Sequence, residues 1–202
     1  MFYTPAEGHG LPHNPLNAIV TPRPIGWIST RSADGSENLA PYSFFNLVAY
    51  VPPQVMFAST GRKPDREEGK DTLSNIRETG VFCVNITGEA HLDAVSASSA
   101  AFGREVDEFE ATGVAREDCV TIPCSRVVGT PATLECRMTE IVTLRGQNNF
   151  LVLGEVTGIH LNDACLIEGR FSPEVFQPLA RMGYRDYAVV RDVFEKLRPG
   201  ES

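Results

Sequence analysis

Apolar positions in the first half of the chain follow the two-residue period of β-strands or form short runs between turn formers. Residues 25–31 are apolar and β-branched, a turn signal follows at residues 33–36, and an extended segment begins again at Glu37. This pattern predicts a hairpin. Residues 54–60 form a further predicted strand, which begins just after a proline pair because residues without an N–H suit the start of a strand.

The second half of the chain carries two long strand signals, at residues 133–144 and 150–161. The segment between them, residues 145–149, contains glycine and asparagine, so we expect a hairpin loop. Residues 81–86 supply one more strand.

Helical signals are fewer and shorter. Asp71 is placed as the N-cap of a helix that ends at Gly80, and residues 89–97 and 105–111 each carry apolar residues on one helical face. The charged segment from Gly61 to Lys70 lacks an apolar period, which predicts an exposed loop. The apolar positions near the C-terminus, residues 189–197, predict an amphipathic helix or an extended arm.

Many strands with few helices favour one mostly β domain, an antiparallel Greek-key barrel with peripheral helices, over a doubly wound sheet. We expect an N-terminal arm at residues 1–17, rich in Gly, Pro and His, and a single domain at 18–202. The chain contains neither a G-x-G-x-x-G sequence nor a P-loop, so a dinucleotide fold is disfavoured.

Composition narrows the possible partners. The formal net charge is -8 and the chain has no dense cluster of Lys and Arg, which excludes nucleic acid as an expected partner. A single small anion can still be bound by one or two cations and backbone N–H groups. No apolar run is long enough to cross a bilayer, and the N-terminus lacks the pattern of a signal peptide, so we expect a cytoplasmic protein.

The cysteines and histidines offer little metal chemistry. Five cysteines occur without a C-x-x-C pair, and we expect most to be buried, inert thiols. Cys119 and Cys124 flank an Ile-Pro pair, and a redox role for them is conceivable but unsupported by the sequence. His9 and His13 have helical spacing, but the intervening Gly10 and Pro12 oppose a helix, so no metal site is predicted.

Two segments are candidates for binding chemistry. Residues 38–46 combine amide, hydroxyl, small and aromatic side chains, which suits either the wall and polar edge of a planar heterocycle or a bulged edge strand with buried aromatics. Residues 59–62 and 70–72 combine hydroxyls and cations at a helix start, which suits either a phosphate or a capped helix after a solvated loop. Asp71 argues mildly against a phosphate placed directly on the helix N-terminus.

Five blocks of sequence, taken together and in order, resemble the flavin reductase-like FMN-binding family, which includes flavoredoxin. The blocks are Thr21-Pro22-Arg23-Pro24-Ile25-Gly26-Trp27-Ile28-Ser29-Thr30, the Asp34-Gly35 turn, Asn38-Leu39-Ala40-Pro41-Tyr42-Ser43-Phe44-Phe45-Asn46, Pro52-Pro53, and Lys70-Asp71-Thr72 with Asn75-Ile76. The segment at residues 179–187 is also similar to the family's C-terminal Arg-x-Gly motif.

The resemblance implies a split β-barrel homodimer that binds FMN non-covalently near the subunit interface. It assigns the isoalloxazine and ribityl chain to Asn38, Ala40, Pro41, Tyr42, Ser43 and Phe44. It assigns the phosphate to Ser59, Thr60, Arg62, Lys70 and Thr72. It brings Arg181 and Tyr184 to the flavin from the C-terminal side or from the partner subunit, whereas Arg23 between two prolines is interpreted as an anchor of the first strand.

The function that this resemblance implies is an NAD(P)H-dependent flavin reductase, or a related flavin-dependent oxidoreductase, with NADH or NADPH as co-substrate and an oxygenase or redox protein as partner. The flavin carries the chemistry, so no catalytic side chain and no metal are required. Two alternatives stay open: a flavoredoxin-type electron carrier without nicotinamide activity, and a non-catalytic flavin- or haem-binding split barrel.

Overall fold

The structure is a computed structural model that describes residues 1–61 and 70–200. Arg62 and the rest of the predicted charged loop up to Gly69 therefore lie outside the described residues. The main strands are β2 (Gly26–Arg31), β3 (Glu37–Tyr42), β4 (Phe45–Tyr50), β5 (Pro53–Thr60), β6 (Val81–Ile86), β9 (Ala132–Thr143) and β10 (Asn149–Leu161). The helices are α1 (Leu16–Ile19), α2 (Asp71–Thr79), η1 (Glu89–His91), α3 (Leu92–Ala97), α4 (Glu108–Thr112), η2 (Asp163–Cys165) and α5 (Pro173–Phe176).

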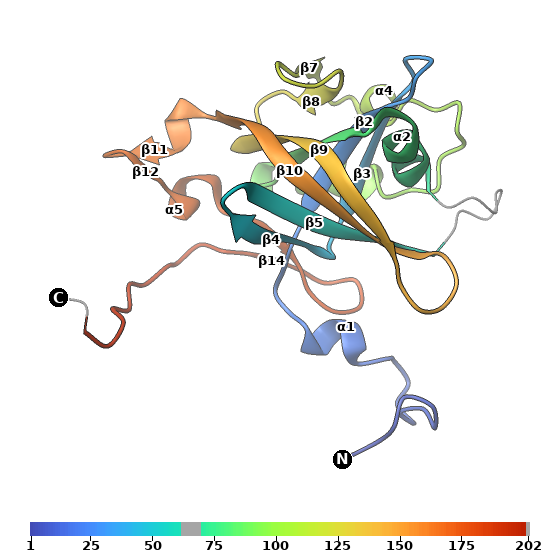
Figure 1. The fold of residues 1–202 in the computed structure, drawn as a ribbon. Coiled ribbons are helices and arrows are strands. Elements are labelled where there is room, and N and C mark those ends of the chain that lie inside the picture. The colour runs from blue at the N-terminus through green and yellow to red at the C-terminus, as the bar shows by residue number, and fades with distance from the viewer. Residues whose placement is uncertain (62–69, 201–202) are drawn as a thin grey trace.

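The seven main strands form one antiparallel sheet in the order β3-β2-β6-β9-β10-β5-β4 (Figure 1). Its two outermost strands, β3 and β4, are consecutive in sequence and are joined by only Ser43 and Phe44. The sheet therefore curls so that its first and last strands meet at one corner. This architecture confirms the predicted antiparallel barrel with peripheral helices.

Strand β2 is buried on both faces, which explains its continuous run of apolar and small residues. Ile28 points into the barrel core, where it joins Phe57 and Phe82. Its neighbour Trp27 points outward, into a second core that α3 and α4 cover through Val95 and Phe109. The alternation along one strand thus attaches the helical layer to the barrel.

Gly154 is required where β10 passes closest to the core. A Cβ atom built at this position would lie 2.4 Å from the Phe82 ring, and the register of β10 on β9 shifts between Leu153 and Gly154. The missing side chain lets the strand bend over the aromatic ring at this point.

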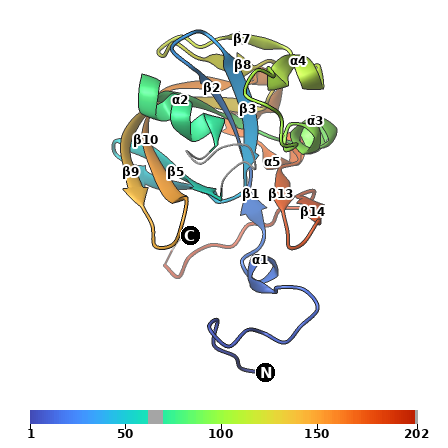
Figure 2. The same cartoon turned by 90° about the vertical axis from the view of Figure 1, so that its right-hand side faces the viewer.

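A second, small sheet lies outside the seven-stranded sheet. It has the order β1-β13-β14, formed by β1 (Arg23–Pro24), β13 (Leu179–Arg181) and β14 (Tyr187–Val189), and lies next to α1 (Figure 2). The buried Arg23 guanidinium donates to the carbonyls of Asn17, Val20 and Met182, at 2.5, 2.5 and 2.7 Å. Arg23 is therefore an anchor, as its position between two prolines suggested.

Four further short strands complete the described chain. Strands β7 (Arg116–Asp118) and β8 (Ser125–Val127) form a hairpin against β2 and β6, and β11 (Leu166–Ile167) pairs with β12 (Arg170–Phe171).

Several local predictions need correction. Lys70, not Asp71, is the N-cap of α2, and Asp71 is its first helical residue, although the helix ends at Gly80 as expected. The predicted helix at 105–111 begins only at Glu108, because the Asp107 side chain caps it by accepting from Phe109 N. Residues 190–198 form no helix, so the extended alternative is the correct one.

Strand β4 was not predicted as a separate element. Its central residues are exposed although several are apolar, so the chain shows no alternation between a buried and a polar face there.

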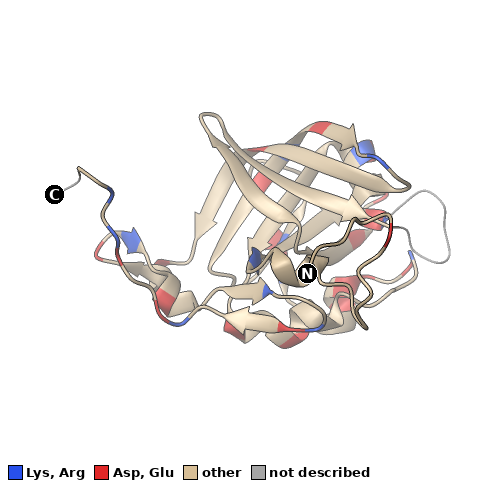
Figure 3. Cartoon of the chain, turned by 90° about the horizontal axis from the view of Figure 1, so that it is seen from below, with Lys and Arg blue, Asp and Glu red and all other residues tan. Residues whose placement is uncertain are grey.

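Along the ribbon of the described residues, positions of Lys and Arg alternate with positions of Asp and Glu (Figure 3). Within residues 1–61 and 70–200, no helix has the length and apolar character needed to span a bilayer.

Candidate functional site

A cavity of about 320 Å³ lies between the edge of the barrel, the start of α2 and the loop that follows α3. This volume falls in the range of small-molecule and cofactor sites. Its lining residues are Asn38, Ala40, Pro41, Tyr42, Lys70, Asp71, Thr72, Ser98, Ser99, Ala100, Ala101 and Glu108. The two candidate segments of the sequence, 38–46 and 70–72, thus meet at one hollow.

The β3 wall of the cavity is an edge strand whose outer backbone groups have no strand beside them. One of these groups, the Leu39 N–H, donates instead to the buried Glu108 carboxylate at 3.1 Å. Pro41, two residues further on, faces the same side of the strand, where a missing N–H costs no ladder hydrogen bond. The proline therefore leaves its carbonyl as the only backbone polar group at that point of the wall.

A buried polar network fixes the junction between β3 and α2. The Asn38 side chain donates to the Thr72 hydroxyl at 2.8 Å, and Asn75 donates to the Thr30 hydroxyl at 3.1 Å. All four side chains are buried. Because such side chains must find partners when they leave water, this network sets how the start of α2 lies against the sheet.

Tyr42 forms the floor of the cavity. Its ring packs on Phe57, with ring centroids 4.7 Å apart, and Lys70 Nζ lies 5.2 Å from the Tyr42 centroid. The hydroxyl is buried near the hydroxyls of Thr72 and Ser59, and it has no hydrogen-bond partner in the protein. Burial raises the pKa of Tyr42 to about 12, and the two nearby hydroxyls offset part of that effect. Tyr42 therefore offers a protonated hydroxyl without a protein partner.

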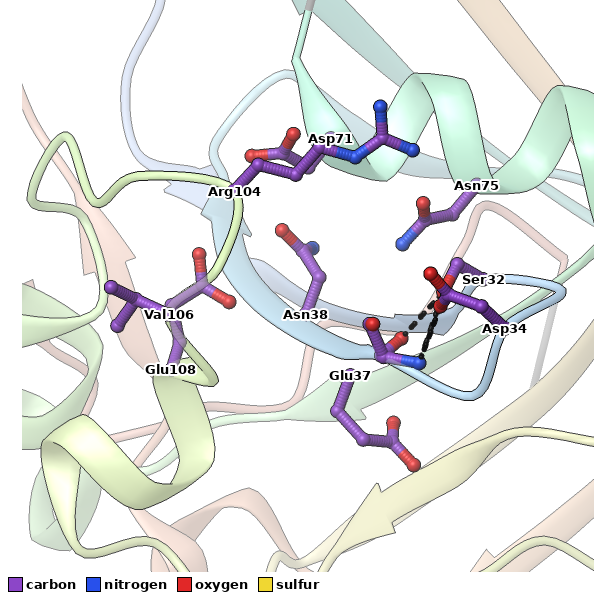
Figure 4. Close-up of a pocket in the computed structure, with 10 residues that line it drawn as sticks. Ser32, Asp34, Glu37, Asn38, Asp71, Asn75, Arg104, Val106 and Glu108 are labelled. Carbon is purple, nitrogen blue, oxygen red and sulfur yellow. Dashed lines mark hydrogen bonds between the residues drawn. The ribbon is translucent and has the colours of Figure 1, made fainter.

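A smaller cavity of about 20 Å³ adjoins this site and shares Asn38, Asp71 and Glu108 with it. Figure 4 shows Asp71 from α2 and Arg104 from the loop before α4 on one side, and the Ser32–Asp34 turn on the other. Asp34 accepts from Ser32 Oγ and from the backbone N–H of Ser36, and these hydrogen bonds lower the pKa of Asp34 to about 2.

Not every predicted residue lines the 320 Å³ cavity. Ser43 and Phe44 form the corner between β3 and β4, and the Phe44 ring lies 5.8 Å from the Arg23 guanidinium. Ser59 is buried at the end of β5, close to Tyr42, and Thr60 is the last residue of that strand. Arg62 lies outside the described residues.

The C-terminal pair lies away from this cavity within one chain. Arg181 donates to the Tyr184 carbonyl at 2.8 Å and stacks on the Tyr187 ring. Tyr184 has a φ of 55° and packs edge-on against His13. Neither residue is among those that line the cavity in this single chain.

Sequence reasoning missed the far wall of the cavity, residues 98–101 and Glu108. Ser98 accepts from the Trp27 indole N–H at 2.9 Å, and this bond connects the wall to the outer core. The serines at 96–99 end a helix, with Ser98 as the C-cap of α3. No local pattern distinguishes Glu108 from any other acid in a first helical turn.

Comparison with known proteins identifies a family and solved structures that this chain resembles. The model of the flavin reductase like domain matches residues 19–178. Nitrilotriacetate monooxygenase component B from Bacillus cereus is 26% identical, with a TM-score of 0.89 over 97% of this chain and 98% of that one. Pseudomonas fluorescens 2-nitrobenzoate 2-nitroreductase is 28% identical, with a TM-score of 0.81 over 92% and 89%.

A third structure, from Shewanella frigidimarina, bears on the fold alone. It contains a split barrel domain and is 22% identical, with a TM-score of 0.80 over 92% of this chain and 90% of that one. The fold is therefore the expected split barrel. Because the family model covers most of the chain, the protein belongs to the flavin reductase-like family.

Proposed function

We propose that this protein binds FMN in the cavity beside β3 and acts as an NAD(P)H-dependent flavin reductase. The observation that carries the proposal is the meeting of six flavin-assigned residues on one cavity: Asn38, Ala40, Pro41, Tyr42, Lys70 and Thr72. The similarity to a monooxygenase component and to a nitroreductase supports an oxidoreductase function and an oxygenase or redox protein as partner.

The described residues fit such a cofactor. The buried Tyr42 hydroxyl lacks a partner, the Thr72 and Ser59 hydroxyls are adjacent to it, and the Lys70 ammonium lies above the same ring. Hydroxyls and an ammonium are the donors that a phosphate needs. Glu108 lines the opposite wall, so we assign the phosphate to the Tyr42–Lys70 side, where the Lys70 charge offsets that of the adjacent Asp71.

In this proposal the chain's own residues position the FMN and polarise it. The Pro41 carbonyl and the Asn38 amide would orient the polar edge of the ring system, and Ala40 lets that ring approach the strand closely. FMN, when bound, supplies hydride acceptance and electron transfer, which no side chain can provide. Lys70 would offset the negative charge of the phosphate at the start of α2.

We further propose a homodimer. Strand β4 is an edge strand with exposed apolar residues along it and just after it: Leu47, Val48, Tyr50 and the following Val51, exposed by 47%, 50%, 82% and 93%. An exposed apolar strip of this kind is typical of a protein interface. A second copy is the occupant we assign to it, because Arg181 and Tyr184 do not line the cavity of their own chain and a partner subunit would bring its own copies of them to it.

The reaction is tested by mixing the FMN-loaded protein anaerobically with NADH or NADPH and following flavin absorbance. We expect rapid bleaching with at least one of the two nucleotides. A protein that binds FMN but is reduced by neither would be an electron carrier instead, and a protein that binds no FMN would contradict the site itself.

The site is tested with Lys70→Ala, alone and combined with Arg62→Ala. Loss of charge-assisted phosphate contacts should weaken FMN binding by roughly 2–5 kcal/mol for the double variant, as measured by fluorescence titration. Lys196→Ala, in the C-terminal segment, is the matched control and should bind FMN like the original protein. Unchanged affinity in the double variant would remove these two cations from the site.

A further inference from the structure

Two cysteines stand opposite each other at the end of the β7–β8 hairpin. The ladder pairs Asp118 with Ser125, and Cys119 and Cys124 are the next pair beyond it. Cys119 N donates to the Cys124 carbonyl at 2.8 Å. Cys124 N donates to the Ile122 carbonyl at 2.9 Å, so a single backbone hydrogen bond joins the two cysteines, and their thiols are close enough to interact. Opposed residues of two antiparallel strands have Cα atoms about 4.5–5.5 Å apart. That separation lies inside the range that a disulfide spans.

The two thiols differ in their access to solvent. Cys119 is partly exposed, whereas Cys124 and the other three cysteines are buried. The Cys124 sulfur lies 3.4 Å from the Ser29 carbonyl on β2, beneath the hairpin. Cys83 packs in the same small cluster, with Val81 and Ile122 around it. A reagent from solvent therefore meets Cys119 first, with a second thiol directly behind it.

The pKa values of the two thiols differ as their exposure does: the partly exposed thiol has the lowered pKa and the buried thiol the raised one. Contacts with the thiols of Cys124 and Cys83 lower the pKa of Cys119, against an opposing effect of burial. The interaction with Cys119 and burial raise the pKa of Cys124. Because the thiolate is the nucleophilic form of cysteine, Cys119 is the more reactive of the two near neutral pH.

The loop between the two cysteines is held in place by one buried carboxylate. Glu135 on β9 accepts from the backbone N–H of Val120 at 2.7 Å and from that of Thr121 at 2.5 Å. His160 on β10 contacts the same carboxylate at 2.5 Å. The hairpin end is thus fixed with the two thiols facing each other, and no large backbone movement is needed to join them.

We propose that Cys119 and Cys124 form a peroxide-sensitive thiol pair, in which Cys119 is oxidised first and Cys124 then closes a disulfide. The Cys119 sulfur attacks hydrogen peroxide, so that an S–O bond forms, the O–O bond breaks, and the departing hydroxide takes a proton to become water. The Cys124 sulfur next attacks the Cys119 sulfur, so that the S–S bond forms, the S–O bond breaks, and the thiol proton leaves in a second water.

The balance is two thiols oxidised by two electrons and one peroxide reduced to two waters. Nothing in this sequence of steps uses the flavin, so the inference does not depend on the proposed function.

The positions of two trypsin cleavage sites allow a specific test of the disulfide. Arg116 and Arg126 flank the pair, so trypsin releases residues 117–126 as one peptide that contains both cysteines. The reduced full-length protein is treated with hydrogen peroxide, with and without dimedone, which traps sulfenic acids, and then mapped by mass spectrometry. We expect this single peptide to lose two hydrogen atoms. In Cys124→Ser and Cys124→Ala we expect a dimedone adduct on Cys119 instead.

Cys165→Ser is the matched control, since Cys165 is buried on a separate element, and it should behave like the original protein. Iodoacetamide should alkylate Cys119 faster than Cys165 by at least about tenfold near pH 7. A cross-link between residues 117–126 and the peptide that carries Cys83 would overturn the assignment of Cys124. Failure of Cys119 to react with peroxide would overturn the whole proposal.

Discussion

The Tyr42 hydroxyl is the least satisfied polar group at the cavity. Among the described residues that line it, this hydroxyl is the only buried side-chain polar atom without a hydrogen-bond partner. A buried group left unpaired costs free energy, so its presence indicates that something other than the protein pairs with it. This makes Tyr42 a sharper marker of the site than Thr72, whose hydroxyl already accepts from Asn38.

Tyr42→Phe should therefore separate binding from stability. We expect FMN affinity to fall by about 0.5–1.5 kcal/mol, the net value of one hydrogen bond, while the free energy of unfolding of the FMN-free protein stays the same or rises slightly. Fluorescence titration and urea unfolding measure the two quantities. Tyr3, in the N-terminal arm, provides the control variant Tyr3→Phe, which should change neither. A large loss of stability in Tyr42→Phe would show that the hydroxyl has a structural role.

Among single residues, the sequence predicted the β3 wall of the cavity but not the wall formed by residues 98–101 and Glu108. Asn38, Pro41 and Tyr42 are recognisable because amide, proline and aromatic residues cluster in one short segment. Glu108 reaches the cavity only because α4 packs against β3 and presents its carboxylate to the Leu39 N–H. That contact joins residues 69 positions apart, and no local pattern encodes it.

Among the elements, the β7–β8 hairpin depends most on a single side chain. Burial alone would raise the pKa of Glu135, but hydrogen bonds from His160, Thr121 and the backbone lower it to about 2. Because the folded-state pKa lies below the ordinary value of 4.5, the stability that Glu135 contributes is complete above about pH 4.5. It is lost as the pH falls toward 2.

We expect full protonation of Glu135 to lower the free energy of unfolding by on the order of 3 kcal/mol. Urea unfolding at about pH 7, 4.5 and 3 should show a steep loss for the original protein and a shallower one for Glu135→Gln, which starts from lower stability. Glu89→Gln removes a pair with Arg191 that also lowers the pKa of Glu89, but solvent screens this exposed pair, so this control should change the acid dependence much less than Glu135→Gln does. Equal slopes for all three proteins would contradict the role of Glu135.

Element boundaries were predictable where capping and periodicity act together. Helix α2 ends at Gly80, which has a φ of 72° that glycine adopts without strain, and the sequence shows this directly. Strand β4 escaped prediction for the opposite reason. Its apolar residues face solvent in the single chain, so no buried face imposes a pattern on them.

For the whole molecule, the exposed β4 surface predicts an assembly. Tyr50→Asp combined with Val51→Asp should convert a dimer to a monomer in size-exclusion chromatography with light scattering, because buried unpaired charges oppose association. If the partner subunit completes the site, the monomeric double variant should also bind FMN more weakly. Val120→Asp is a matched control, since Val120 is 80% exposed on the β7–β8 hairpin, at the opposite end of the barrel (Figure 1). A double variant that remains dimeric would place the interface elsewhere.

The Arg23 anchor has a consequence for how the chain is made. Its guanidinium joins carbonyls at positions 17 and 20 to one at position 182, so it ties segments 159 residues apart. During synthesis, residues 17–23 leave the ribosome long before residue 182 does, so the full set of hydrogen bonds to Arg23 forms only after residue 182 has emerged. The segment around Arg23 therefore reaches its final place later than its position in the sequence would suggest.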